Sequence, residues 1–136
     1  MMRTAVAYGV ALLALGALDG VWLGLIAKDF YRAGLGSLMA ERVNMGAAAA
    51  FYLLYPVGLV FFVIRPALDG DAVSAALWRG ALFGLFAYAT YDLTNLATLR
   101  DFPARVAFVD MAWGAVASAI VSGAAFYAAS LMPNHS

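Results

Sequence analysis

Four long apolar runs, separated by short polar stretches, dominate the chain. They cover residues 4–27, 45–64, 80–99 and 106–132, and each meets the need of a membrane-crossing helix for roughly 20 apolar residues. Three runs contain a single aspartate, and the second contains no charge. The pattern predicts an all-α, multi-pass membrane protein with four transmembrane helices in a single bundle, short loops and one domain over residues 1–136.

The start of the chain is similar to a signal peptide, because Arg3 is followed by an apolar stretch. The apolar run continues to residue 27, however, and the hydrophobic region of a signal peptide is only about 7–15 residues long. We therefore expect the first helix to be retained as a membrane span.

The longest connection, residues 29–44, mixes charged and apolar side chains and contains Gly34 and Gly36. One interpretation is an amphipathic segment lying at the membrane interface. The other is a plain loop whose charged side chains reach back toward water. The pattern leaves both open.

Composition agrees with a membrane location. Hydrophobic residues make up 65% of the chain and charged residues 12%, and the mean hydropathy is +0.87. Soluble domains are nearer half apolar and a quarter charged. The formal net charge is zero, so we expect no nucleic-acid partner and take the lipid bilayer as the main surrounding. A homo-oligomer or a larger membrane complex stays open.

The most informative residues are the three aspartates inside apolar runs, Asp19, Asp92 and Asp110. A charge at such a position costs at least about 2.5 kcal/mol on insertion scales. At about 1.5 Å per residue, the three lie about 12, 10 and 6 Å from the side of the first loop. Three helices therefore bring a carboxylate to a similar depth.

Polar and aromatic neighbours accompany these acids at helical spacing. Residues three or four apart share a helix face, and the second helix adds Tyr52, Tyr55 and the kink-forming Pro56. We therefore take as the candidate ligand-binding set Asp19, Trp22, Tyr88, Tyr91, Asp92, Asn95, Asp110 and Trp113.

Two interpretations of this polar layer compete. In the first, it binds a cation, a proton or a small polar or lipid-like ligand, since intramembrane acids commonly mark functional sites. In the second, each aspartate pairs with an arginine, tyrosine or asparagine and fixes the packing of the helices. Arg100 and Arg105 lie close enough in sequence to serve Asp92 and Asp110.

The residue inventory excludes several chemistries. There is no cysteine, the only histidine is His135 and the only lysine is Lys28. Bis-histidine haem, common zinc sites and a retinal Schiff base therefore lack their ligands. We expect no metal and no cofactor, and an enzyme is the less favoured class.

Small residues at four-residue spacing mark two helix faces. Gly80 and Gly84 lie on the third apolar run, and Gly114, Ser118 and Ser122 lie on the fourth. Such faces let helices approach closely in lipid. We expect them to pack inside one bundle, with a dimer interface as the alternative.

Four segments carry a resemblance to a known family. They are LDGVWL at 18–23, FYLLYPVG at 51–58, YATYDLTNLAT at 88–98 and VDMAWG at 109–114. Together they resemble the bacterial predicted membrane proteins grouped as domain of unknown function 2177. The resemblance implies a four-helix, multi-pass protein of the bacterial inner (plasma) membrane with unassigned activity.

Three functional hypotheses follow. The first is a carboxylate and aromatic pocket that binds a cation, proton or small amphiphile, with transport as one use of it. The second is a small accessory or assembly subunit of a membrane complex. The third is a lipid-modifying enzyme acting at the membrane interface.

Overall fold

The computed structural model describes residues 1–70 and 72–133, and His135 lies outside them. Within them the chain is helical and forms no strand. The α-helices are α1 (Met2–Val21), α2 (Lys28–Leu35), α3 (Met45–Leu59), α4 (Arg65–Leu68), α5 (Val73–Thr98) and α6 (Ala104–Ser130). A π-helical turn, Trp22–Ile26, extends α1, and a second, Val60–Ile64, joins α3 to α4.

Three helical segments of the described chain are long and apolar enough to cross a membrane. They are Met2–Ile26, Met45–Leu68 and Ala104–Ser130. The helix α5 is as long, with 26 residues, but polar side chains fill its second half. The prediction of membrane-spanning helices is thus confirmed for three of the four expected spans.

The second span ends later than the sequence predicts. The sequence predicts that Pro66 closes this helix after the apolar run ends at residue 64, because proline cannot continue a helix. The helix instead continues to Leu68. Pro66 stands in the first turn of α4, directly after the π-helical turn Val60–Ile64. The preceding π-helical turn changes the hydrogen-bonding pattern just before it, which lets the proline be accommodated without ending the helix.

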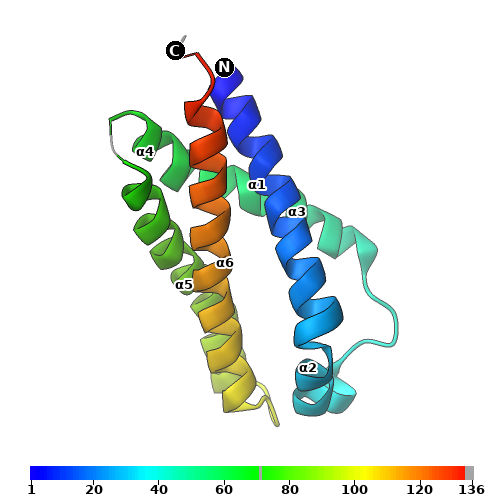
Figure 1. Cartoon of the computed structure of the whole chain (residues 1–136). Coiled ribbons are helices and arrows are strands. Elements are labelled where there is room, and N and C mark those ends of the chain that lie inside the picture. Colours follow the sequence, from blue (N-terminus) through cyan, green and yellow to red (C-terminus); the bar gives the residue numbers. More distant parts are fainter. Residues whose placement is uncertain (71, 134–136) are drawn as a thin grey trace.

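The helices α5 and α6 form an antiparallel pair at close range (Figure 1). A Cβ added to Gly80 would meet the Ser118 carbonyl and the Ser122 side chain at 2.6–2.8 Å, and one added to Gly84 would meet Gly114 and Ser118. Only glycine allows this approach. The prediction that these small residues pack within the bundle is confirmed.

The helices meet tightly at the end of the bundle that holds both termini. There, α1, the Met45–Leu68 segment and α6 share a buried core of small and aliphatic side chains, which we call the closed end: Ala7, Ala11, Leu15, Leu59, Val60, Val63, Ile64, Val121, Ala125 and Ala129. In Figure 1 the termini lie side by side at the top, and α3 crosses obliquely behind α1 and α6.

The connection after α1 is partly helical, and its place at the membrane interface stays a prediction. The helix α2 spans Lys28–Leu35 and ends at Gly36, whose φ of 52° favours glycine. Tyr31 is buried on its inner face, and Gly34 approaches Val106 of α6 so closely that a Cβ would clash. The helix α2 thereby covers the N-terminal end of α6.

Candidate functional site

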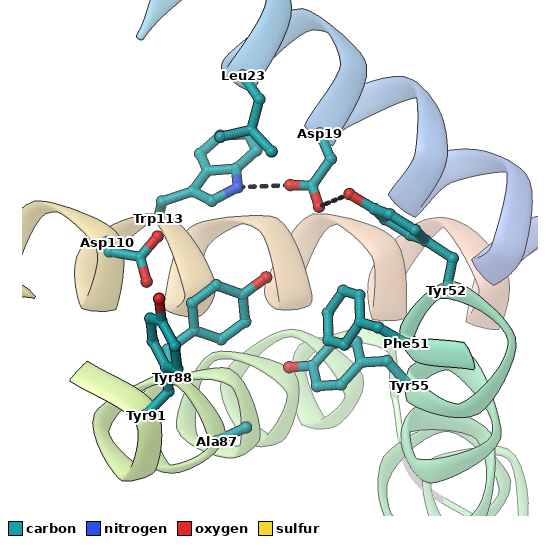
Figure 2. Close-up of a pocket in the computed structure, with 10 residues that line it drawn as sticks. All are labelled: Asp19, Leu23, Phe51, Tyr52, Tyr55, Ala87, Tyr88, Tyr91, Asp110 and Trp113. Carbon is teal, nitrogen blue, oxygen red and sulfur yellow. Dashed lines mark hydrogen bonds between the residues drawn. The ribbon is translucent and has the colours of Figure 1, made fainter. Parts of the chain in front are cut away.

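A cleft of about 450 Å³ lies between α1, α3, α5 and α6 (Figure 2). Aromatic rings form most of its walls, and two carboxylates face it. The lining residues are Asp19, Leu23, Phe51, Tyr52, Tyr55, Ala87, Tyr88, Tyr91, Asp110 and Trp113.

Asp19 is held in place by two hydrogen bonds from other helices. Its carboxylate accepts from Trp113 Nε1 at 2.8 Å and from the Tyr52 hydroxyl at 2.7 Å, and Figure 2 shows it between these two side chains. The residue is only 5% exposed. A buried carboxylate must find hydrogen-bond donors, and here both donors are neutral groups.

Asp110 is held from the side of α2. Its carboxylate accepts a 2.7 Å hydrogen bond from the Tyr31 hydroxyl, which in turn accepts from Trp22 Nε1 at 3.1 Å. The Trp22 and Trp113 rings stack with centroids 4.5 Å apart. The indole pair therefore connects the surroundings of Asp110 to those of Asp19.

Tyr31 remains a hydrogen-bond donor at ordinary pH. It lies on α2, outside the three spans. Burial raises the pKa of its hydroxyl well above the ordinary value of 10.0; the Trp22 hydrogen bond opposes this rise and the Asp110 carboxylate adds to it. The neutral phenol thus keeps its proton directed at Asp110.

Asp92 lies outside the cleft. The residue is completely buried, and no donor among residues 1–70 and 72–133 bonds to either carboxyl oxygen. It neighbours Asp110, with the two carboxyls close enough to share a hydrogen bond if one is protonated. The sequence placed the three acids in one layer, whereas the structure divides them between two that face the cleft and one behind.

No basic side chain in residues 1–70 and 72–133 forms an ion pair or hydrogen bond with any of the three acids. The one ion pair between residues of this part of the chain joins Arg65 Nη2 to Asp69 Oδ1, 3.7 Å apart. The structural interpretation that assigned Arg100 and Arg105 to these acids therefore lacks its arginine partners. Tyrosine and tryptophan donors take their place.

The other residues of the candidate set also divide into those that line the cleft and those that do not. Tyr88, Tyr91 and Trp113 line the cleft, whereas Trp22 and Asn95 do not. Tyr88 is fixed by Gly114, because a Cβ at that position would overlap the tyrosine ring. Trp22 serves the site indirectly, through Tyr31 and Trp113.

Two residues that the candidate set omitted supply essential hydrogen bonds. They are Tyr52, which the sequence analysis named beside Pro56 but left out of the set, and Tyr31 of α2. The signal for Tyr52 was its place one turn before the proline, on the face shared with Tyr55. For Tyr31 the signal was weak, since its partner Asp110 lies 79 positions away.

The inner end of the cleft is closed by α3 against α5. Tyr55 shares a 2.6 Å hydrogen bond with Ser118 and contacts the rings of Phe83 and Tyr88. Close backbone contacts between α3 and α5 are few, and the lining residues Phe51 and Tyr91 are exposed. The cleft thus opens sideways between these helices.

The lining is acidic and aromatic. Of the described residues around the cleft, none is basic, and within residues 1–70 and 72–133 no group of three histidine, cysteine, aspartate or glutamate residues is arranged to hold a metal ion. Carboxylates attract positive charge, and aromatic faces bind organic cations. The arrangement suits a positively charged group carrying an apolar body.

Comparison with known proteins gives a family and no further relative. No curated protein and no solved structure matches the chain. A family model described as "Predicted membrane protein (DUF2177)" matches residues 4–127, which is nearly the whole chain and includes every residue of the candidate set. The chain therefore belongs to this family of predicted membrane proteins, domain of unknown function 2177.

Proposed function

We propose that this protein crosses the inner membrane four times and uses its cleft to bind an organic cation with an apolar body, taken up from the bilayer. The proposed binding of a cation rests on one observation. Two carboxylates, Asp19 and Asp110, face one aromatic-lined cleft that has no basic residue among its described lining.

The fourth span is α5. Its glycines pack against small residues in the middle of α6, which is itself a candidate span, and only a short turn separates the two helices. An antiparallel partner in such contact occupies the same depth of the bilayer. At about 1.5 Å per residue, 26 residues reach about 39 Å, more than the hydrocarbon thickness of about 30 Å.

The polar second half of α5 is less polar in effect than its composition suggests. The exposed hydroxyls of Thr90, Thr94 and Thr98 each donate to the carbonyl four residues earlier. A hydroxyl bonded to its own helix can face lipid at little cost. Asp92 points away from lipid, into the bundle.

Cysteine labelling tests the fourth span, because the natural chain contains no cysteine. Asp69→Cys and Arg100→Cys place single thiols just before and just after α5. A membrane-impermeant maleimide added to sealed vesicles is expected to label one and not the other. Labelling of both from the same side would show that α5 does not cross.

The cation hypothesis follows from charge and shape together. Each cleft carboxylate receives hydrogen bonds only from neutral donors, so a cation placed between them gains attraction that no side chain already supplies. Tyr52, Tyr88 and Trp113 offer ring faces to the same space. The sideways opening between α3 and α5 lets an apolar body stay in contact with lipid.

Binding of tetraphenylphosphonium to the protein in nanodiscs tests this hypothesis. Titration calorimetry is expected to give one site per chain, with affinity about tenfold lower for Asp19→Asn and for Asp110→Asn, equivalent to about 1.4 kcal/mol each. Asp29→Asn is the matched control, because Asp29 lies on α2, is exposed and does not line the cleft.

Two results would contradict the hypothesis. Equal affinity of all four proteins would place the cation in lipid or at another surface. Absence of binding, together with a stoichiometric partner protein in native mass spectra of gently extracted material, would favour the accessory-subunit hypothesis and make the hydrogen bonds of Asp19 and Asp110 structural.

A further inference from the structure

Asp92 is the one buried acid to which the proposed function gives no role. It is fully buried, and neither of its oxygens accepts a hydrogen bond from the described part of the chain. The other two acids receive three hydrogen bonds between them from tyrosine and tryptophan. A buried carboxylate without a donor is costly enough that it is rarely left ionised.

The packing register of α5 and α6 places Asp92 opposite Asp110. Gly80 faces Ser122, and Gly84 faces Ser118. The next step of four residues on both helices brings Tyr88 onto Gly114, as the close approach of its ring shows. One further step in the same register pairs Asp92 with Asp110, and their carboxyls do interact.

Within residues 1–70 and 72–133, no ion pair balances the charge of Asp92 or Asp110. From α2, Tyr31 donates to Asp110. On α5, Tyr91 lies beside both acids and Tyr88 lies near Asp110, and across the cleft α1 carries the acid Asp19. Of the described residues, no lysine or arginine pairs with Asp92 or Asp110. Two carboxylates in such surroundings cannot both ionise without strong repulsion.

We infer that Asp92 and Asp110 hold one proton between them, and that a cation entering the cleft releases this proton. The proton supplies the hydrogen bond that Asp92 otherwise lacks. Because Asp110 faces the cleft and Asp92 does not, Asp110 is the member of the pair that meets the incoming charge. When it does, the proton leaves through the cleft to water.

The second half of this inference rests on the proposed function, and the first half does not. A proton shared by two carboxyls is a property of the protein without ligand. Its exchange for a cation follows by linkage, since a site that binds either a proton or a cation binds each more weakly in the presence of the other.

Infrared difference spectroscopy tests the shared proton without any ligand. Near neutral pH, the wild-type protein is expected to show the C=O stretch of a protonated carboxyl. The band is expected to disappear in Asp92→Asn, because an asparagine amide can donate to Asp110 in place of the proton. Asp19→Asn is the matched control and keeps the band, because Asp19 lies outside the pair.

The pH dependence of tetraphenylphosphonium binding tests the exchange. In the wild type, affinity is expected to rise by up to about tenfold per pH unit while the pair holds its proton, as one-for-one exchange requires. The slope is expected to vanish in Asp92→Asn. In Asp19→Asn the affinity is lower at every pH, but the slope remains.

The outcomes separate the two proposals. A carboxyl band that Asp92→Asn removes, without cation binding, keeps the shared proton and rejects the proposed function. Cation binding with no band and no slope overturns the shared proton and leaves the cleft as a binding site. Binding that requires sodium, with no carboxyl band, would place a sodium ion between Asp92 and Asp110 and also overturn the inference.

Discussion

The two ends of the bundle are held together by different means. At the closed end, α1, the Met45–Leu68 segment and α6 meet through small and aliphatic side chains. At the end nearer the first loop, the same helices are connected by hydrogen bonds from aromatic side chains to Asp19 and Asp110, around a cleft of about 450 Å³.

This difference shows how a small membrane protein combines stability with a polar site. Lipid tails are as apolar as leucine, so helices in a bilayer gain stability from close packing and hydrogen bonds rather than from burial as such. The closed end relies on the packing of small and aliphatic side chains. The cleft end uses hydrogen bonds, which hold the helices together while they stand apart.

The largest loss of stability is expected from Gly84→Ala, which pushes α5 away from α6. The new Cβ would overlap the Gly114 carbonyl and the Ser118 side chain, and backbone cannot move aside as a flexible side chain can. We expect a loss of about 3 kcal/mol in stability, measured by unfolding in mixed micelles.

Gly9→Ala provides the control for this change. Nothing lies within 4 Å of a Cβ at Gly9, and alanine favours a helix over glycine by about 1 kcal/mol. The stability should be unchanged or slightly higher. An equal loss in both variants would contradict the close approach of α5 to α6.

A smaller effect is expected from Leu15→Ala at the closed end. Leu15 is completely buried in the core shared by α1 and α6, so its removal leaves a cavity, and we expect a loss of about 2 kcal/mol. Leu25→Ala is the control, because Leu25 is 79% exposed and lipid refills the space. Cation binding should persist in Leu15→Ala wherever the protein remains folded.

Much of this architecture could be predicted from the sequence, because a bilayer permits few solutions. Apolar runs of about 20 residues have to be helices there, and the spacing of Gly80, Gly84, Ser118 and Ser122 predicted their packing inside the bundle. The Pro66 boundary was missed because the effect of a proline depends on the turn before it, here a π-helical one.

The candidate site was harder to predict because depth in the membrane is only one coordinate. Counting residues placed Asp19, Asp92 and Asp110 in one layer, but the rotation of each helix decides which way a side chain points. That rotation is set by packing, and it leaves Asp92 outside the cleft. The donor Tyr31 comes from a separate short helix, and no local pattern links it to Asp110.

The smallest loss of stability is expected from Tyr31→Phe, and its pH dependence distinguishes the cleft end from the closed end. Tyr31→Phe removes the donor to Asp110 and is expected to cost about 1 kcal/mol at neutral pH, while the closed end is untouched. Because burial raises the pKa of Tyr31 above 10.0 in the folded protein, its contribution is fully present below pH 10 and is lost as the pH rises further, when the unfolded chain releases this proton first. The stability difference between wild type and Tyr31→Phe should therefore narrow above pH 10, whereas the difference between wild type and Leu15→Ala should stay constant.

Unfolding of the three proteins, measured across that pH range, provides the test. A stability difference between wild type and Tyr31→Phe that is independent of pH would mean that this hydroxyl does not hold the cleft end together.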